Sequence, residues 1–208
     1  MHTIRKCWQA EFWMAVLIFV GSYLYPTIVL SAEPSVVVNK FHAVLLSVMK
    51  TGAKTTVKSR YKRLEPEINN AFNLPFMIRV ITGSRWKRAS HEEKINLTDA
   101  FRRMSVGTYA ARFNSYSGQS FKTLKVRNGP KSTRLVDTQL ESPGDRPVKL
   151  TYVMRKFGNH WKITDVLLDQ GISEMAMRAS EYRAILRSRG PGALALALNK
   201  KAGKLINN

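Results

Sequence analysis

From Pro34 to about residue 116, apolar residues recur at steps of three and four, which is the spacing of an amphipathic helix. The pattern predicts three helices, over residues 34–52, 55–74 and 74–86. Gly52 and Gly83 are natural ends for the first and the third of them. Pro66 lies inside the second, so we expect a kink or a break there.

The next helix has the clearest start signal in the chain. Ser90 and Glu93 have the spacing of a capping box, in which each side chain binds the backbone N–H of the other residue. The apolar residues that follow form two stripes slightly out of phase, one through Phe101 and one that ends at Tyr116. Two stripes on one helix indicate more apolar surface than contact with a single sheet requires.

After Gln119 the period of the pattern changes from that of a helix to that of a strand. Four strand-like segments, separated by turn-forming residues, occupy residues 119–129, 131–145, 146–159 and 160–171. Short connections predict an antiparallel meander. A helix from Ser173 and a last helix opened by Pro191 follow. This order predicts an α+β fold in which a four-stranded antiparallel sheet packs against helices.

The fourth strand carries an acidic residue in an apolar row. Simple alternation places Trp161, Ile163, Asp165 and Leu167 on one face of the sheet. A carboxylate in such surroundings can act as a general base. It can also accept hydrogen bonds from backbone N–H groups or an arginine, because an unpaired buried charge is costly. The structural role is favoured, and catalysis stays open as the alternative.

Residues 1–32 have the features of a secretory signal. A short basic start precedes an apolar run, and small residues end it at Ser31 and Ala32, where a peptidase can cut. An uncleaved membrane anchor is the alternative, because the run is close to the lower length of a spanning helix. We expect cleavage, which leaves residues 33–208 as a single domain.

The charge balance is strongly basic. Thirty-four Lys and Arg against 14 Asp and Glu give a net charge of +20, which attracts polyanions. Export argues against nucleic acid as a partner, and no RNA- or DNA-binding motif is present. The charge is better explained by attraction to an anionic membrane surface or an acidic docking surface. Cys7 is the only cysteine and lies in the predicted signal, so no disulfide is expected.

No sequence motif for a metal, a cofactor or a nucleophile is present. Three histidines follow the predicted signal, His42, His91 and His160, and they do not have the spacing of metal ligands. The G-x-S-x-G pattern and the phosphate-binding loops are absent. The sequence therefore implies no cofactor.

Three segments together resemble a known family. They are "RYKRLEPEINNAFNLPFMIRVITGSRWKRAS", "FRRMSVGTYAARFNSYSGQSF" and "FGNHWKITDVLLDQGISEMAMRASEYRAIL". They are similar to the periplasmic lipid-binding proteins of the MlaC type, also called toluene-tolerance auxiliary proteins. The tail "SEYRAILRSRGPGALALALNKKAGKL" is most similar to the HpnM branch, which is associated with hopanoid lipids.

The resemblance implies a carrier and not an enzyme. Such a carrier shuttles a phospholipid or hopanoid between an inner-membrane transporter and an outer-membrane acceptor complex. The implied fold is similar to the nuclear-transport-factor (NTF2-like) cone with an extra helical part, and an apolar cavity lies between sheet and helices. Within this resemblance Asp165 is a structural polar residue. The expected lipid-binding residues are Phe76, Met77, Val80, Ile81, Phe101, Met104, Tyr109, Phe121, Leu150, Tyr152, Met154, Trp161 and Ile163.

Two other functions are kept as hypotheses. One is a small isomerase or hydrolase on a similar cone, with Asp165 as general base. The other is a membrane-anchored interaction subunit with a filled core, which requires residues 1–32 to remain attached. The sequence alone does not distinguish phospholipid from hopanoid as cargo.

Overall fold

The computed structural model describes residues 33–169 and 171–207, so the signal predicted for residues 1–32 lies outside the described part. Five helices come first: α1 (Pro34–Gly52), α2 (Val57–Ala71), α3 (Leu74–Thr82), α4 (Ser84–Arg88) and α5 (His91–Arg112). Five strands follow: β1 (Ser120–Asn128), β2 (Arg134–Glu141), β3 (Val148–Phe157), β4 (His160–Leu168) and β5 (Ile172–Ser173). The last two helices are α6 (Glu174–Ser188) and α7 (Gly190–Asn207).

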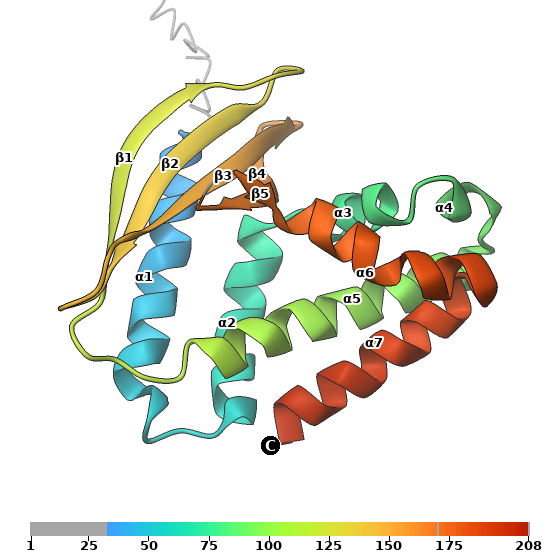
Figure 1. Ribbon diagram of the computed structural model, residues 1–208, viewed down its shortest axis with the longest axis horizontal. Helices are drawn as coiled ribbons and strands as arrows, with labels where there is room; N and C mark the ends of the chain where they lie inside the picture. Colours follow the sequence, from blue (N-terminus) through green and yellow to red (C-terminus); the bar gives the residue numbers. More distant parts are fainter. Residues whose placement is uncertain (1–32, 170, 208) are drawn as a thin grey trace, which may run out of the picture. The chain divides into compact units, whose positions relative to one another are not determined.

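The strands form one antiparallel sheet in the order β1-β2-β3-β4-β5, which confirms the predicted meander and the α+β fold. The short strand β5 pairs with the end of β4 and was not predicted, because two residues show no alternation. Figure 1 shows α1 running beneath the sheet, while α5 and α7 pack against each other in the helical part.

The local signals for helix ends are confirmed. The hydroxyl of Ser90 accepts from the Glu93 N–H at 3.1 Å, and the Glu93 carboxylate accepts from the Ser90 N–H at 2.8 Å. Helix α3 ends at Gly83, whose φ of 57° suits glycine. At the start of α6, the hydroxyl of Ser173 accepts from the Ala176 N–H at 3.0 Å. Side-chain caps therefore fix where these helices begin.

The sequence predicted a kink or a break in α2 at Pro66, and the break is wrong. The helix runs without interruption from Val57 to Ala71, although a proline in a helix interior costs about 3 kcal/mol. Leu64 and Ile68, on either side of the proline, are fully buried where α2 packs against α1 and α5. Burial of this face offsets the cost of the proline.

A buried arginine joins the ends of two helices. Arg60 of α2 is only 5% exposed, and its guanidinium donates to the carbonyl oxygens of Ala110 at 2.8 Å and Gly52 at 2.9 Å. It also donates to the carbonyl of Thr55. The last carbonyls of a helix have no partner within the helix, so one cation satisfies groups at the ends of both α1 and α5.

Strand β4 contains a bulge that corrects the predicted face of Asp165. Ile163 pairs with Met154 and Asp165 pairs with Val153, so Thr164 is an extra residue without its own partner on β3. Paired residues share a face of the sheet, so Ile163 lies on the helix-facing side with Met154 and Asp165 lies on the opposite side with Val153. The prediction that Asp165 shares a face with Trp161 and Ile163 is therefore wrong.

The core between sheet and helices centres on Phe41 of α1, which is fully buried. The rings of Phe72, Tyr109 and Tyr152 contact it edge-on, with centroid distances of 5.1, 5.4 and 6.3 Å. Edge-to-face arrangements at such distances are favourable for aromatic pairs. Tyr109 and Tyr152 also border a cavity beside this cluster.

Candidate functional site

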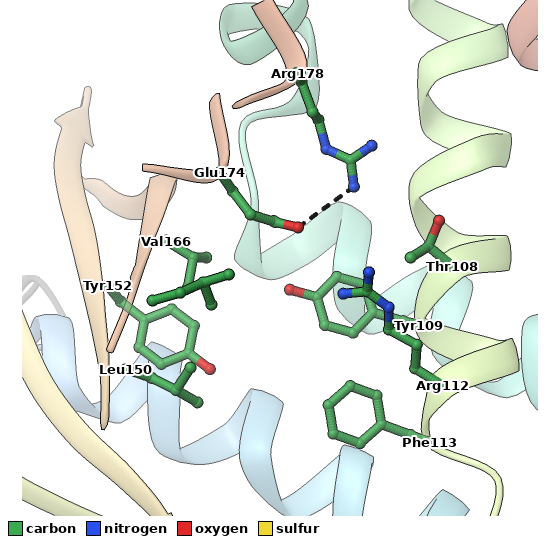
Figure 2. A pocket seen from close by; sticks show the side chains of 10 residues that line it. Thr108, Tyr109, Arg112, Phe113, Leu150, Tyr152, Val166, Glu174 and Arg178 are labelled. Atoms are coloured by element: carbon green, nitrogen blue, oxygen red, sulfur yellow. Dashed lines mark hydrogen bonds and ion pairs between the residues drawn. The ribbon is translucent and has the colours of Figure 1, made fainter. Parts of the chain in front are cut away.

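An apolar cavity of about 130 Å³ lies between helix α5, strands β3 and β4 and the start of α6. Figure 2 shows its side chains converging from these elements. Its lining consists of Thr108, Tyr109, Arg112, Phe113, Leu150, Tyr152, Val166, Leu168, Glu174 and Arg178. Rings and aliphatic groups make up most of this wall, and the charged groups come from two helices, α5 and α6.

The periodicities of helix and strand explain how the apolar wall forms. Tyr109 and Phe113 are four residues apart, so they project from the same side as α5 ends, and their rings stack 5.7 Å apart. Leu150 and Tyr152 are two residues apart on β3, so they share a face. Val166 pairs with Tyr152 and reaches the same side only because the bulge at Thr164 shifts the register of β4.

Behind the cavity, Tyr152 binds a buried histidine. Nε2 of His42 lies 2.8 Å from the Tyr152 hydroxyl oxygen, and the imidazole stacks on Phe121 at 4.0 Å. His42 is only 3% exposed, and burial lowers its pKa to about 4. Burial also raises the pKa of Tyr152 and that of Tyr109. All three groups are therefore neutral at pH 7, which keeps this side of the cavity uncharged.

A second, more polar hollow of about 320 Å³ adjoins the cavity, and we call it the vestibule. It is lined by Thr108, Ala111, Arg112, Glu174, Met177, Arg178, Glu181, Lys201 and Leu205. Four of these residues, Thr108, Arg112, Glu174 and Arg178, also line the apolar cavity. The two spaces therefore meet at a boundary that carries both positive and negative side chains.

Two ion pairs lie in the lining of the vestibule. Arg178 lies 3.4 Å from Glu174, one turn earlier on α6, and Lys201 of α7 lies 3.0 Å from Glu181. Arg178 also donates to the Tyr182 hydroxyl at 3.2 Å. Among the described residues, Arg112 has no ion-pair partner. One cation at the boundary is thus left for a ligand.

Asp165 holds the start of α6 in place. One of its carboxylate oxygens accepts from the N–H groups of Val166 at 2.8 Å and Met175 at 3.1 Å, and the other accepts from the Ser173 hydroxyl. A carboxylate at a helix N-terminus binds free N–H groups and is favoured by the helix dipole. Asp165 therefore fixes the turn from which Glu174 and Arg178 project.

The structure distributes the thirteen predicted lining residues over several places. Tyr109, Leu150 and Tyr152 line the apolar cavity. Six are buried in the packed core: Met77, Ile81, Phe101, Met104, Met154 and Ile163. Phe121 and Trp161 are partly buried at the edge of that core, and Phe76 borders a separate shallow hollow. Val80 is 48% exposed on α3 and is not brought to the cavity.

The sequence prediction missed seven lining residues of the apolar cavity. Phe113 had a usable signal, because it lies one helical turn after Tyr109. Val166 and Leu168 were missed because simple alternation cannot foresee the bulge. Thr108, Arg112, Glu174 and Arg178 were missed because an apolar pattern does not indicate polar or charged lining residues.

No group of three or more His, Cys, Asp or Glu side chains in residues 33–169 and 171–207 is arranged to hold a metal ion. No helix within the same ranges is both long enough and apolar enough to cross a membrane.

Comparisons with known proteins give two findings. The family model described as MlaC protein matches residues 39–200. A solved structure of a phospholipid-binding protein from Ralstonia solanacearum, in complex with a phospholipid, has the same fold with a TM-score of 0.73. The sequence identity is 19%, and the match covers 84% of this chain and 99% of the other. No curated protein matches the sequence.

Proposed function

The chain belongs to the MlaC family. From that premise we propose that it is a lipid carrier that shelters an acyl chain in the cavity between α5 and strands β3 and β4. The observation that carries the proposal is the apolar wall formed by Tyr109, Phe113, Leu150 and Tyr152. Ligand sites of this kind are mostly apolar, with a few polar groups that fix orientation. The Ralstonia solanacearum protein, which has the same fold, is described as bound to a phospholipid.

The energetics agree with a carrier. Each methylene group moved out of water contributes about 0.8 kcal/mol, so an acyl chain needs an apolar shelter and no covalent chemistry. The apolar cavity matches the acyl chain of a lipid, and its polar opening matches the headgroup.

The cavity must widen to accept a whole lipid. Its volume of about 130 Å³ is well below that of ordinary ligand pockets, which is roughly 300–1,000 Å³. The closed form accommodates only a short piece of a chain. We infer that the wall formed by the start of α6 separates from α5 when lipid enters, because these elements border the space on its more polar side.

The contacts of Asp165 favour the carrier over the alternative enzyme. A general base needs a free oxygen directed at a substrate proton. Both oxygens of Asp165 already accept hydrogen bonds at the start of α6. Replacing Asp165 with Asn would abolish turnover in the enzyme, whereas in the carrier it reduces stability.

The cellular route is also part of the proposal. We place the protein in the periplasm, exported by residues 1–32, and carrying phospholipid or hopanoid between an inner-membrane transporter and an outer-membrane acceptor. Exposed cations at one end of the helical part, Lys87 and Arg88 of α4 with Arg187 and Arg189 at the end of α6, suit transient contact with an anionic membrane. Figure 1 places α4 and the turn between α6 and α7 at the same end.

Native mass spectrometry of the full chain, purified from an exporting cell, tests the proposal. We expect a complex with one lipid, which solvent extraction then identifies as phospholipid or hopanoid. The mass of the stripped chain also reports whether residues 1–32 were removed. A chain that carries no lipid and takes up none from vesicles would contradict the proposal.

A further inference from the structure

We propose that the vestibule is a headgroup site for a zwitterionic phospholipid, with the phosphate bound by Arg112 and Arg178 and the headgroup amine bound by Glu181. This inference rests on the proposed carrier function and specifies which lipids that function serves. It follows from the position of the vestibule, from its cations and from its carboxylates.

The position suits a headgroup because the vestibule continues directly from the apolar cavity. Thr108, Arg112, Glu174 and Arg178 border both spaces. Figure 2 shows Glu174 and Arg178 reaching the cavity from above, and Arg112 beside Tyr109 on the side across from Leu150 and Tyr152. An acyl chain lying against the apolar wall therefore places its phosphate near these guanidinium groups.

The cations suit a phosphate. Arg112 is exposed and has no ion-pair partner among the described residues, so it can turn toward a ligand. The Arg178 side chain is only 14% exposed, and its contact with Glu174 is long, at 3.4 Å. Guanidinium groups bind phosphate oxygens through two parallel hydrogen bonds, which makes arginine the side chain best matched to this group.

The carboxylates distinguish a zwitterionic headgroup from an anionic one. The vestibule carries three cations, Arg112, Arg178 and Lys201, and two carboxylates, Glu174 and Glu181. Glu181 and Lys201 form a pair in which both side chains are 51% exposed, and such pairs contribute little. The Glu181 carboxylate can therefore leave Lys201 for a headgroup amine. A headgroup without an amine, such as that of phosphatidylglycerol, offers the Glu181 carboxylate no positive partner and lacks this charge-assisted contact.

The test is a competition between two lipids that differ only in the headgroup. The full chain, freed of lipid, is mixed with equal amounts of phosphatidylethanolamine and phosphatidylglycerol with identical acyl chains, and native mass spectrometry measures the two complexes. We expect the wild type to prefer phosphatidylethanolamine several-fold. Arg112→Gln is expected to reduce binding of both lipids by about tenfold, because a charge-assisted pair is lost. Arg112→Lys keeps the charge but loses the two parallel hydrogen bonds of a guanidinium. Its lipid binding is expected to lie between that of the wild type and that of Arg112→Gln.

Glu181→Gln tests binding of the headgroup amine separately from binding of the phosphate. This variant is expected to bind phosphatidylethanolamine several-fold less well, down to the level of phosphatidylglycerol, so that the preference is lost. Arg183→Gln is the matched control, because Arg183 is exposed on the same helix and does not line the vestibule. Circular dichroism melts confirm that each variant is folded.

Three results would overturn the inference. They are an Arg112→Gln variant that binds lipid as well as Arg183→Gln does, a Glu181→Gln variant that keeps the wild-type preference, and a wild type that binds both lipids equally. In each case lipid is still bound, so the proposed function stands. A wild type that takes up neither lipid overturns the proposed function and this inference together.

Discussion

The packed core around Phe41 and the cavity beside it are built from the same kinds of side chain, yet one is filled and the other is not. Tyr109 and Tyr152 belong to both, since each contacts Phe41 and also borders the cavity. Phe41 is surrounded on all sides, whereas Phe113 and Leu150 are only half-buried. The difference teaches that stability and the proposed lipid binding depend on adjacent sets of residues, which overlap at these two tyrosines.

Phe41→Ala is expected to have the largest effect on stability. Removing a fully buried ring from a packed core should lower the free energy of unfolding by about 4 kcal/mol. Phe113→Ala removes the same ring from the cavity wall and should cost less than about 2 kcal/mol, because that ring is only partly buried. Urea denaturation of both variants measures the difference. Equal losses would show that the cavity wall is ordinary core.

Lowering the pH probes the histidine behind the cavity. The pKa of His42 is about 4 in the folded protein and about 6.5 in the unfolded chain. The unfolded chain therefore binds the proton more readily, and stability falls as the pH drops from about 6.5 toward 4. A difference of this size corresponds to about 3 kcal/mol.

Unfolding of the wild type and of His42→Gln is measured across this range of pH. The wild type should lose stability more steeply than the variant. His160→Gln is the control, because His160 is exposed, and it should keep the wild-type slope. If His42→Gln keeps that slope as well, burial does not depress the pKa of His42.

Asp165→Asn tests the link between strand β4 and helix α6. The substitution removes the charged acceptor at the start of α6, so stability should fall by about 2 kcal/mol. Asp169→Asn breaks only the exposed pair with Arg146, at 3.5 Å, and should change stability by less than about 0.5 kcal/mol. Thermal melts of the two variants provide the comparison. A loss no larger for Asp165→Asn than for Asp169→Asn would show that the cap is dispensable.

Leu150→Trp should have the smallest effect on stability and a large effect on binding. The added ring enters space that is empty, so the free energy of unfolding should change by less than about 1 kcal/mol. The same ring occupies the place proposed for the acyl chain, so lipid occupancy should fall strongly. Val148→Trp, on the same strand but 45% exposed, should leave occupancy unchanged. Native mass spectrometry measures both, and unchanged occupancy in Leu150→Trp would place the lipid elsewhere.

Local signals in the sequence were enough to predict the longer elements and their order, but not the short helix α4 or the short strand β5. The capping box at Ser90 and Glu93, the end of α3 at Gly83 and the start of α6 after Ser173 each depend on a few neighbouring residues. The meander followed from turn residues between alternating segments. Pro66 was misjudged because its cost is local, whereas the burial of Leu64 and Ile68 depends on the packing of three helices.

The cavity was harder to predict, for a physical reason. Apolar spacing shows that a side chain faces inward, but it does not show whether neighbours fill the space beside it. Met154 and Ile163 are completely buried, whereas Leu150 lines the cavity. The bulge at Thr164 brings Val166 to the cavity and turns Asp165 away from it. The pairing register of β3 and β4 determines both positions, and this register cannot be predicted from a short stretch of sequence.

The most direct test of the central claim is to locate a bound acyl chain. The protein is loaded with a phospholipid that carries a photoreactive diazirine near the end of one acyl chain, irradiated, digested and analysed by mass spectrometry. We predict that the label is attached mainly to Tyr109, Phe113 and Leu150. Labels on the shallow hollow around Phe76, or on the exposed side of α3 at Val80, would contradict the account.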